Sequence, residues 1–142
     1  MACEESRMEA LSFDLSWSTK TFRLQAKAEL SASITGLIGP SGSGKSSLIN
    51  LLAGLTRPDS GQLVFDGETL VDTTRAIFVP PWKRRFGVVF QESRLWPHQN
   101  VLQQIRFGGR HREADVIELC GLEPLLSRLP SKLSGGEKQR VA

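Results

Sequence analysis

The sequence predicts an α/β fold, and three observations carry this prediction. The N-terminal part contains short segments in which apolar and polar residues alternate, as they do in a half-buried β-strand. A glycine-rich stretch then lies between an apolar run and a segment with helical spacing, and the C-terminal part is helical in its periodicity. With 142 residues the chain has the length of one domain with a hydrophobic core. We therefore expect one α/β unit that carries a helical portion.

Five segments of the sequence are expected to form strands. Residues 11–15 and 22–26 alternate apolar and polar side chains, which is typical of strands with one buried face. Residues 34–38 form a nearly continuous apolar run, which predicts a central strand buried on both faces. Residues 62–65 and the apolar run 86–90 are the remaining strand candidates.

Hydrophobic periodicity predicts helices in three places. Residues 46–52 carry apolar side chains at helical spacing, and Gly54 is suited to end that helix. Residues 101–107 and 114–119 show the same periodicity, with a glycine pair between them.

Residues 39–46 read Gly-Pro-Ser-Gly-Ser-Gly-Lys-Ser, which is the complete spacing of a phosphate-binding P-loop. Glycines permit positive φ angles, so the backbone N–H groups can close around phosphate oxygens at the positive end of the following helix. Lys45 is expected to reach the β- and γ-phosphates, and the Ser46 hydroxyl to ligate Mg²⁺. The nucleotide-binding residues that we expect are Gly39, Pro40, Ser41, Gly42, Ser43, Gly44, Lys45, Ser46 and Ser47.

A second glycine motif, Leu-Ser-Gly-Gly-Glu-Lys-Gln-Arg, occupies residues 133–140. Ser134 and Glu137 have the spacing of a capping box, which predicts that Ser134 is the N-cap of a helix. Gly135 and Gly136 leave the start of this helix bare, so phosphate oxygens could approach its N–H groups. Taken alone, the motif predicts only a well-capped helix.

Together the two motifs resemble those of ABC-type ATPases, and the resemblance covers the whole chain. It implies a P-loop NTPase core, incomplete in residues 1–142, with an N-terminal antiparallel β region and a helical subdomain. The implied single partial domain has a β-rich region and P-loop core over about residues 1–90. Its Q-loop and helical subdomain cover about residues 91–142 and end at the signature motif.

Further site residues follow from this resemblance. Residues 88–92 resemble the Q-loop, whose glutamine, Gln91 here, is implied to contact the magnesium and its water and to sense a membrane partner. An aromatic residue a little under thirty positions before the P-loop lysine usually stacks on adenine, and Trp17 is the candidate. Phe13 and Phe22 are near it in sequence, and core packing would explain all three aromatic residues.

The resemblance also implies how the ATP site is completed. Two subunits pair head to tail, so that each ATP lies between one P-loop and the partner's signature residues Ser134, Gly135, Gly136 and Glu137. The family's water-orienting glutamate and switch histidine follow the signature motif, so no catalytic residue of that kind is expected within residues 1–142, and His98 and His111 are not the switch histidine. We expect residues 1–142 alone to be poorly stable, to bind nucleotide weakly and not to turn it over.

Three stretches resemble the ATPase subunits of molybdate importers in particular: residues 83–87, residues 94–98, and residues 121–126 with 128–130. The implied partners are membrane permease subunits and, through them, a molybdate-binding protein, with the chain peripheral on the cytoplasmic face of the plasma membrane. An importer for sulfate, sugar or polyamine, a non-transport ABC ATPase, and a non-enzymatic nucleotide-binding remnant remain open as alternatives.

Composition excludes several other classes of protein. The formal net charge of +3 is mild, and the one dense basic cluster, residues 83–85, is expected to be solvated surface, so no nucleic-acid partner is expected. No run approaches the ~20 apolar residues that cross a bilayer. Cys3 and Cys120 have no neighbouring Cys or His cluster, so neither zinc nor a disulfide is expected, and Cys120 is expected to be a buried reduced thiol.

Overall fold

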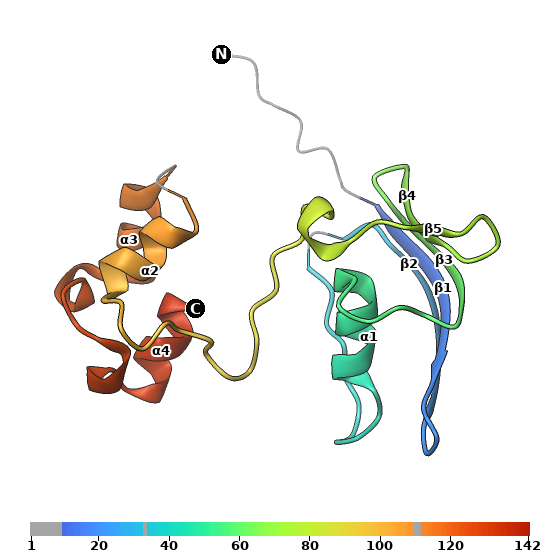
Figure 1. Cartoon of the computed structure of the whole chain (residues 1–142), viewed down its shortest axis with the longest axis horizontal. Coiled ribbons are helices and arrows are strands. Elements are labelled where there is room, and N and C mark those ends of the chain that lie inside the picture. Colours follow the sequence, from blue (N-terminus) through green and yellow to red (C-terminus); the bar gives the residue numbers. More distant parts are fainter. Residues whose placement is uncertain (1–9, 33, 110–111) are drawn as a thin grey trace, which may run out of the picture. The chain divides into compact units, whose positions relative to one another are not determined.

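The fold is seen in a computed structural model that describes residues 10–32, 34–109 and 112–142. The chain divides into two units, Met1–Gly87 and Val88–Ala142. The first holds a β-sheet and one α-helix in its described residues, and the second is helical, as Figure 1 shows by colour from blue to red.

The sheet of the first unit is antiparallel throughout, with the strand order β2-β1-β3-β4-β5. The strands are β1 (Leu11–Ser18), β2 (Arg23–Leu30), β3 (Ser60–Phe65), β4 (Glu68–Asp72) and β5 (Ile77–Phe78). Strands predicted at 11–15, 22–26 and 62–65 are confirmed, each within a longer or slightly shifted element. The strands β4 and β5 were not predicted.

Two glycines fix the geometry of β3. Asp66 and Gly67, with φ values of 47° and 80°, form the two-residue turn between β3 and β4, and positive φ at both positions suits the twist of a hairpin. Gly61 lies where β3 passes β1, and a Cβ there would overlap the carbonyl of Asp14. The close pairing of β1 with β3 therefore depends on the missing side chain of Gly61.

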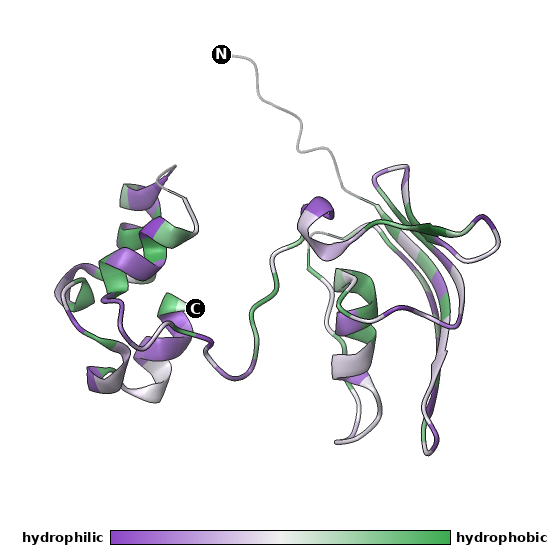
Figure 2. Cartoon of the chain, in the orientation of Figure 1, coloured by the Kyte–Doolittle hydropathy of each residue, from purple (hydrophilic) through white to green (hydrophobic). Residues whose placement is uncertain are grey.

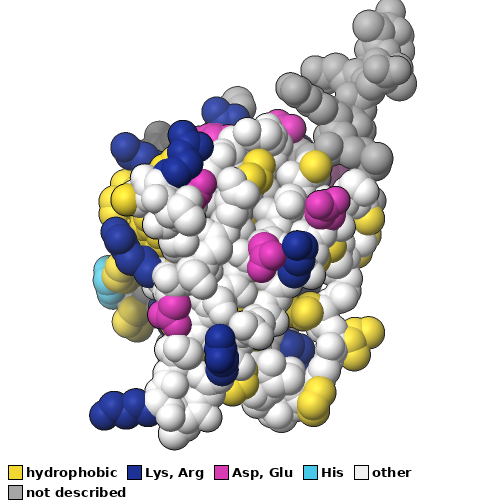
Figure 3. All heavy atoms as spheres, turned by 90° about the vertical axis from the view of Figure 1, so that its right-hand side faces the viewer, with side chains coloured by type: hydrophobic (Ala, Val, Ile, Leu, Met, Phe, Trp, Pro, Cys, Tyr) yellow, Lys and Arg dark blue, Asp and Glu magenta, His cyan; other side chains and the backbone are white. Residues whose placement is uncertain are grey.

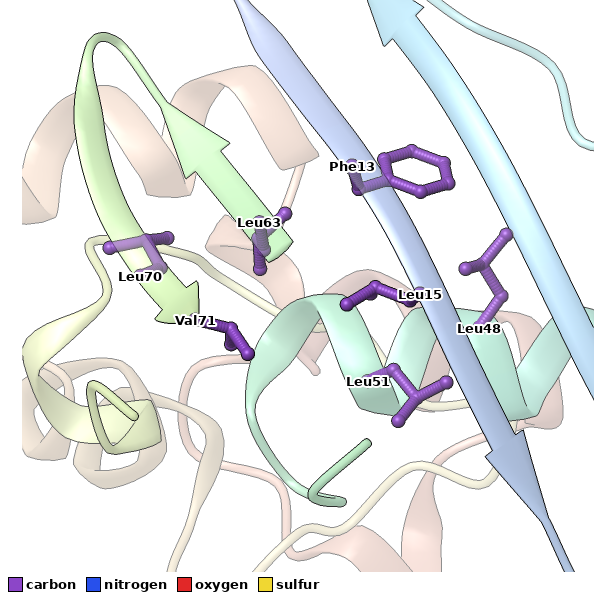
Figure 4. Close-up of a cluster of buried hydrophobic side chains, with 7 residues drawn as sticks. All are labelled: Phe13, Leu15, Leu48, Leu51, Leu63, Leu70 and Val71. Carbon is purple, nitrogen blue, oxygen red and sulfur yellow. The ribbon is translucent and has the colours of Figure 1, made fainter. Parts of the chain in front are cut away.

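The core of the first unit lies between the inner face of the sheet and α1 (Lys45–Ala53). Figure 4 shows Leu48 and Leu51 of the helix facing Phe13 and Leu15 of β1, two positions that share a face because side chains alternate along a strand. The complete cluster comprises Phe13, Leu15, Leu48, Leu51, Leu63, Leu70 and Val71.

The outer face of the same sheet is polar. Asp14 of β1 and Lys27 of β2 are opposite each other in the strand register and form an exposed ion pair of 3.2 Å. Figure 3, which views the molecule from the sheet side, shows acidic and basic side chains interspersed over this surface. A surface pair of this kind adds little to stability, so the sheet is held by its inner face.

The described residues of the second unit form three α-helices around a small apolar cluster. They are α2 (Val101–Phe107), α3 (Glu113–Cys120) and α4 (Gly135–Val141), and the short 3-10 turns η2 (Glu123–Leu125) and η3 (Pro130–Lys132) lie between α3 and α4. Val101, Leu122, Leu125 and Leu133 form the cluster. Figure 2 shows hydrophobic and hydrophilic residues mixed along these helices, as amphipathic packing requires. The predicted helices at 101–107 and 114–119 are confirmed.

Side-chain caps set the starts of α2 and α4. Asn100 and Gln103 form a reciprocal capping box at α2. At α4 the Ser134 hydroxyl accepts from the Glu137 N–H at 3.3 Å, while the Glu137 carboxylate accepts from the Ser134 N–H at 2.6 Å. The predicted capping box at Ser134 is thereby confirmed.

Two of the predicted strands are wrong. Residues 34–38 pair with no strand in the described ranges, and Ile34 and Ile38 are 89% and 96% exposed. Residues 86–90 also form no strand. An apolar run becomes a central strand only where neighbouring strands take up its N–H and C=O groups, and the antiparallel sheet places none beside these segments.

Two expectations about single side chains need correction. Arg84, expected within a solvated basic cluster, is 1% exposed, whereas Lys83 and Arg85 on either side of it are exposed. Cys120 carries a free thiol as expected, but it is half-buried at the margin of the second core.

The capping box at α4 gives unit 2 a pH-dependent contribution to stability. Bonds from the Ser134 N–H and hydroxyl, helped by the nearby Arg128 and Arg140, lower the pKa of the Glu137 carboxyl. Because the pKa is lower in the folded state, this contribution is present above the unfolded pKa and is lost as pH falls through the folded pKa. We expect Glu137→Gln to be less stable than the unsubstituted chain near neutral pH and to lose that difference in acid.

The measurement is the denaturation midpoint of the helical signal from about pH 3 to pH 7. Glu118→Gln, which alters an exposed carboxylate on α3, is the matched control. Parallel profiles for Glu137→Gln and the unsubstituted chain over the whole range would contradict the assignment.

Candidate functional site

The glycine loop at residues 39–44 leads directly into α1, whose N-cap is Gly44. Gly44 has no side chain to cap the first turn, and that turn contains no acidic residue. The first N–H groups of an α-helix have no partner within the helix, and they carry the positive end of its dipole. The start of α1 is therefore suited to an anion.

Backbone conformation explains the loop glycines. Gly42 and Gly44 have φ values of 80° and 92°, in the region that residues with a Cβ rarely adopt. A Cβ on Gly44 would also be 2.7 Å from the Phe22 ring, and one on Gly39 would be 2.9 Å from the Ser43 hydroxyl oxygen. The loop closes on itself through a hydrogen bond from the Ser43 N–H to the Pro40 carbonyl, at 3.3 Å.

Lys45 is the first residue of α1, and its side chain folds back over the loop. Its Nζ donates to the carbonyls of Gly39 and Pro40, both at 2.7 Å. The ammonium group is thus held above the same backbone whose N–H groups would surround a phosphate. The hydroxyl-bearing residues of the motif line the loop and the first turn: Ser41, Ser43 and Ser46 are exposed, and Ser47 is half-buried.

The candidate Trp17 and its aromatic neighbour Phe22 differ in surroundings. Trp17 lies on β1 opposite Leu24 of β2, is half-buried and packs against the sheet core. Phe22 precedes β2, and its ring lies against Gly44 at the end of the loop. Phe13, the third aromatic residue of this region, is a buried core residue. Sequence spacing pointed to Trp17 and gave no signal that Phe22 touches the loop.

Gln91 lies in the second unit, at an exposed bend after residues 86–90. Its neighbour Phe90 accepts a hydrogen bond at its carbonyl from Gln139 of α4, at 3.4 Å, and the Arg94 guanidinium lies 4.1 Å from the Phe90 ring centroid. The segment that contains Gln91 is thus linked to the helix of the second glycine motif.

The second motif presents an open surface. Nothing lies within 4 Å of where a Cβ would stand on Gly135 or Gly136. Within the capping box the Ser134 hydroxyl accepts from the Glu137 N–H and also bonds the Glu137 carboxylate. Glu137 is committed to the cap and lies 3.6 Å from Arg128. Gly135 and Gly136 are therefore the groups of this motif that leave the start of α4 open to an anion.

The described residues contain neither a cluster of metal-ligating side chains nor a membrane-spanning helix. No group of three or more His, Cys, Asp or Glu side chains is arranged to hold a metal ion there. No helix in the same ranges is long and apolar enough to cross a bilayer. His98 lies beside Trp96, with ring centroids 6.3 Å apart, whereas His111 falls outside the described residues.

Similarity to solved structures extends over nearly the whole chain. A bacterial Atm1-family ABC exporter with ATP bound matches 99% of this chain and 27% of its own with a TM-score of 0.76 and 26% identity. An ATP-binding subunit of an ABC transporter matches 92% of this chain and 58% of its own, with a TM-score of 0.71. At 24% identity, the second match shows the fold alone.

Curated sequence relatives have higher identity to this chain than these two solved structures. The molybdenum import ATP-binding protein ModC of Mesorhizobium japonicum is 52% identical over 85% of this chain and 35% of its own length. ModC of Pectobacterium atrosepticum is 47% identical over 93% of this chain and 39% of its own. The chain thus spans a little over a third of the length of these relatives.

A family model described as ABC transporter matches residues 27–142, which include the glycine loop, Gln91 and the whole second motif. The fold expected from the two motifs, an antiparallel β region and helices within part of an ABC ATPase domain, is confirmed. By this match, the chain belongs to the ABC transporter family, within its ATP-binding domain.

Proposed function

We propose that this chain is the nucleotide-holding part of an ATP-binding subunit that energises a membrane importer. The observation that carries the proposal is the glycine loop, in which positive-φ glycines, an uncapped helix start and the Lys45 ammonium converge on one small volume. Such a volume fits the β- and γ-phosphates of ATP. Membership of the family supports ATP as the nucleotide.

The loop and the first turn of α1 have proposed roles. Backbone N–H groups of the non-proline residues from Gly39 to Ser47 surround the phosphate oxygens, and Lys45 exchanges its two carbonyl acceptors for phosphate oxygens when ATP binds. The Ser46 hydroxyl would ligate Mg²⁺, which would supply positive charge against the charge that develops during phosphoryl transfer. Gln91, in the second unit, is separately proposed as the Q-loop glutamine.

The second motif is proposed to act across a dimer. Ser134, Gly135 and Gly136 would contact the γ-phosphate of an ATP held by the P-loop of a second copy, in a head-to-tail pair. The open surroundings of Gly135 and Gly136 support this role. Residues 1–142 contain no candidate for the carboxylate that orients the attacking water, so we expect hydrolysis from the whole protein and not from these residues alone.

Molybdate is the proposed cargo, on the strength of the ModC relatives. The partners proposed for the whole protein are permease subunits and, through them, a molybdate-binding protein, at the cytoplasmic face of the plasma membrane. We assign the first unit to the nucleotide core and the second to the permease side. An open cavity of about 300 Å³ supports this assignment, since its lining includes Arg94, Trp96 and Phe107, with Phe107 70% exposed.

Nucleotide binding is tested with the chain itself. Lys45→Ala should weaken ATP binding by about 10- to 100-fold, because a charge-assisted bond to phosphate is lost. Ser46→Ala should remove most of the gain in affinity that Mg²⁺ gives over a solution containing EDTA. Isothermal titration calorimetry measures both effects. Lys27→Ala, on the outer face of the sheet, is the matched control, and equal affinity for Lys45→Ala and Lys27→Ala would refute the proposal.

The roles of Trp17 and Phe22 in binding are distinguished by comparing the affinity for ATP with that for inorganic tripolyphosphate, which has no base. Trp17→Ala should lower ATP affinity about 3- to 10-fold and leave tripolyphosphate unchanged, because only stacking on adenine is lost. Phe22→Ala should weaken both ligands, since its ring supports Gly44. Trp82→Ala, at an exposed tryptophan of the 3-10 turn η1 (Pro81–Lys83), is the control. Equal loss of both ligands in Trp17→Ala would exclude it as the base contact.

The cargo is tested with the whole protein in cells. Deleting its gene should lower molybdate accumulation, measured as cellular molybdenum by mass spectrometry, and leave sulfate uptake unchanged. Restoring the gene with Lys45→Ala should not recover accumulation, because nucleotide binding is lost. A fall in sulfate uptake with normal molybdenum would replace molybdate with sulfate as the cargo.

A further inference from the structure

Arg84 is a buried arginine at the far end of the P-loop helix. Although Lys83 and Arg85 are exposed, the side chain of Arg84 runs into the first unit and is 1% exposed. Its Nη1 donates to the carbonyls of Leu51 at 3.1 Å and Leu52 at 2.7 Å, and its Nε donates to the Val79 carbonyl at 2.7 Å.

Two of these three acceptors belong to the last turn of α1. The final carbonyls of a helix have no partner within the helix and carry the negative end of its dipole. The last turn of α1 contains no basic residue of its own, so Arg84, thirty-two residues further along from Leu52, supplies the cation there. The same guanidinium also binds Val79, directly after β5, and so fastens the helix end to the sheet.

Packing alone does not account for an arginine at this position. All three acceptors are neutral carbonyls, and Nη2 is buried with no hydrogen-bond partner in the part of the chain that is described. Burial lowers the pKa of the Arg84 guanidinium, and the face of the Phe78 ring, 4.9 Å away, offsets only part of the desolvation. An apolar side chain would fill the space without that cost.

Gly54 makes room for this contact. It ends α1 with a φ of 78°, and a Cβ placed on it would be 2.5 Å from Arg84 Nε and 2.6 Å from Cζ. The helix terminator and the guanidinium therefore fit each other. A side chain at residue 54 would displace the guanidinium from the helix carbonyls.

We propose that Arg84 is a positioning residue for the phosphate-binding loop, acting through α1 as a rigid lever. The helix has nine residues and a length of about 13 Å, so a tilt of about 5° at its C-terminal end moves its N-terminus by about 1 Å. Leu48 and Leu51 press one face of the helix onto the sheet, but apolar contact is not directional. The three hydrogen bonds of Arg84 are directional, and they fix the axis along which the N–H groups meet a phosphate.

This inference rests on the proposed nucleotide binding, and its test separates the two. Arg84→Met keeps the length and loses the charge, Arg84→Lys keeps the charge and loses the planar fork, and Arg85→Met is the exposed neighbouring control. Affinities for ATP and tripolyphosphate are measured by calorimetry at a temperature where circular dichroism shows each variant to be folded. We expect Arg84→Met to weaken both ligands by about tenfold, Arg84→Lys by less, and Arg85→Met not at all.

Gly54→Ala provides an independent disturbance of the same contact. If both substitutions act by releasing the helix end, the loss of affinity in Arg84→Met/Gly54→Ala should be smaller than the product of the two single losses. A folded Arg84→Met chain that binds both ligands within twofold of the unsubstituted chain, whatever its melting temperature, overturns the inference and leaves the proposed function standing. Absence of ATP binding by the unsubstituted chain overturns both.

Discussion

The burial of one face of α1 against an antiparallel sheet is the constraint on which the proposed nucleotide site depends. Leu48 and Leu51 project from the helix onto Phe13 and Leu15, and these contacts hold the segment that begins at Lys45. The glycine loop itself is short of side chains and exposed, so it can contribute little apolar burial of its own. The conformation of the loop is set by α1, which follows it, by the Phe22 ring against Gly44, and by the positive φ angles of its glycines.

The second unit is organised on a smaller scale. Four buried residues make its core, and two capping boxes fix the starts of α2 and α4. With so small a core, polar contacts at helix ends carry a larger share of the local order than they do in the first unit. The segment that bears Gln91 is tied to α4 through the bond from Gln139 to the Phe90 carbonyl. The Q-loop candidate and the signature candidate thus belong to one locally connected structure.

Much of this arrangement could be read from the sequence, and the errors have physical causes. The glycine loop and the capping box were predictable because spacing alone defines them, and the helix at 101–107 has a strong 3.6-residue period. The strand predicted at 34–38 failed because an apolar run reports a preference for burial but not whether neighbouring strands are there to provide it. The strand β4 was missed because Glu68–Asp72 is short and of mixed polarity.

Arg84 shows a different limit of sequence reasoning. A run of three basic residues predicts a solvated surface, and nothing in the run indicates which member turns inward. That depends on where the carbonyls at the end of α1 come to lie, and they are fixed only by the fold. The same holds for Phe22, whose contact with Gly44 joins residues far apart in the chain.

The exposed apolar segment at residues 34–38 affects how copies of these residues associate in solution. It is uncharged, and its two isoleucines lie almost wholly in solvent, which is the composition that pairs strand to strand between molecules. For residues 1–142 by themselves, this composition favours association through the segment at high concentration. Because residue 38 is followed at once by Gly39, the exposure of this segment and access to the glycine loop are linked in these residues.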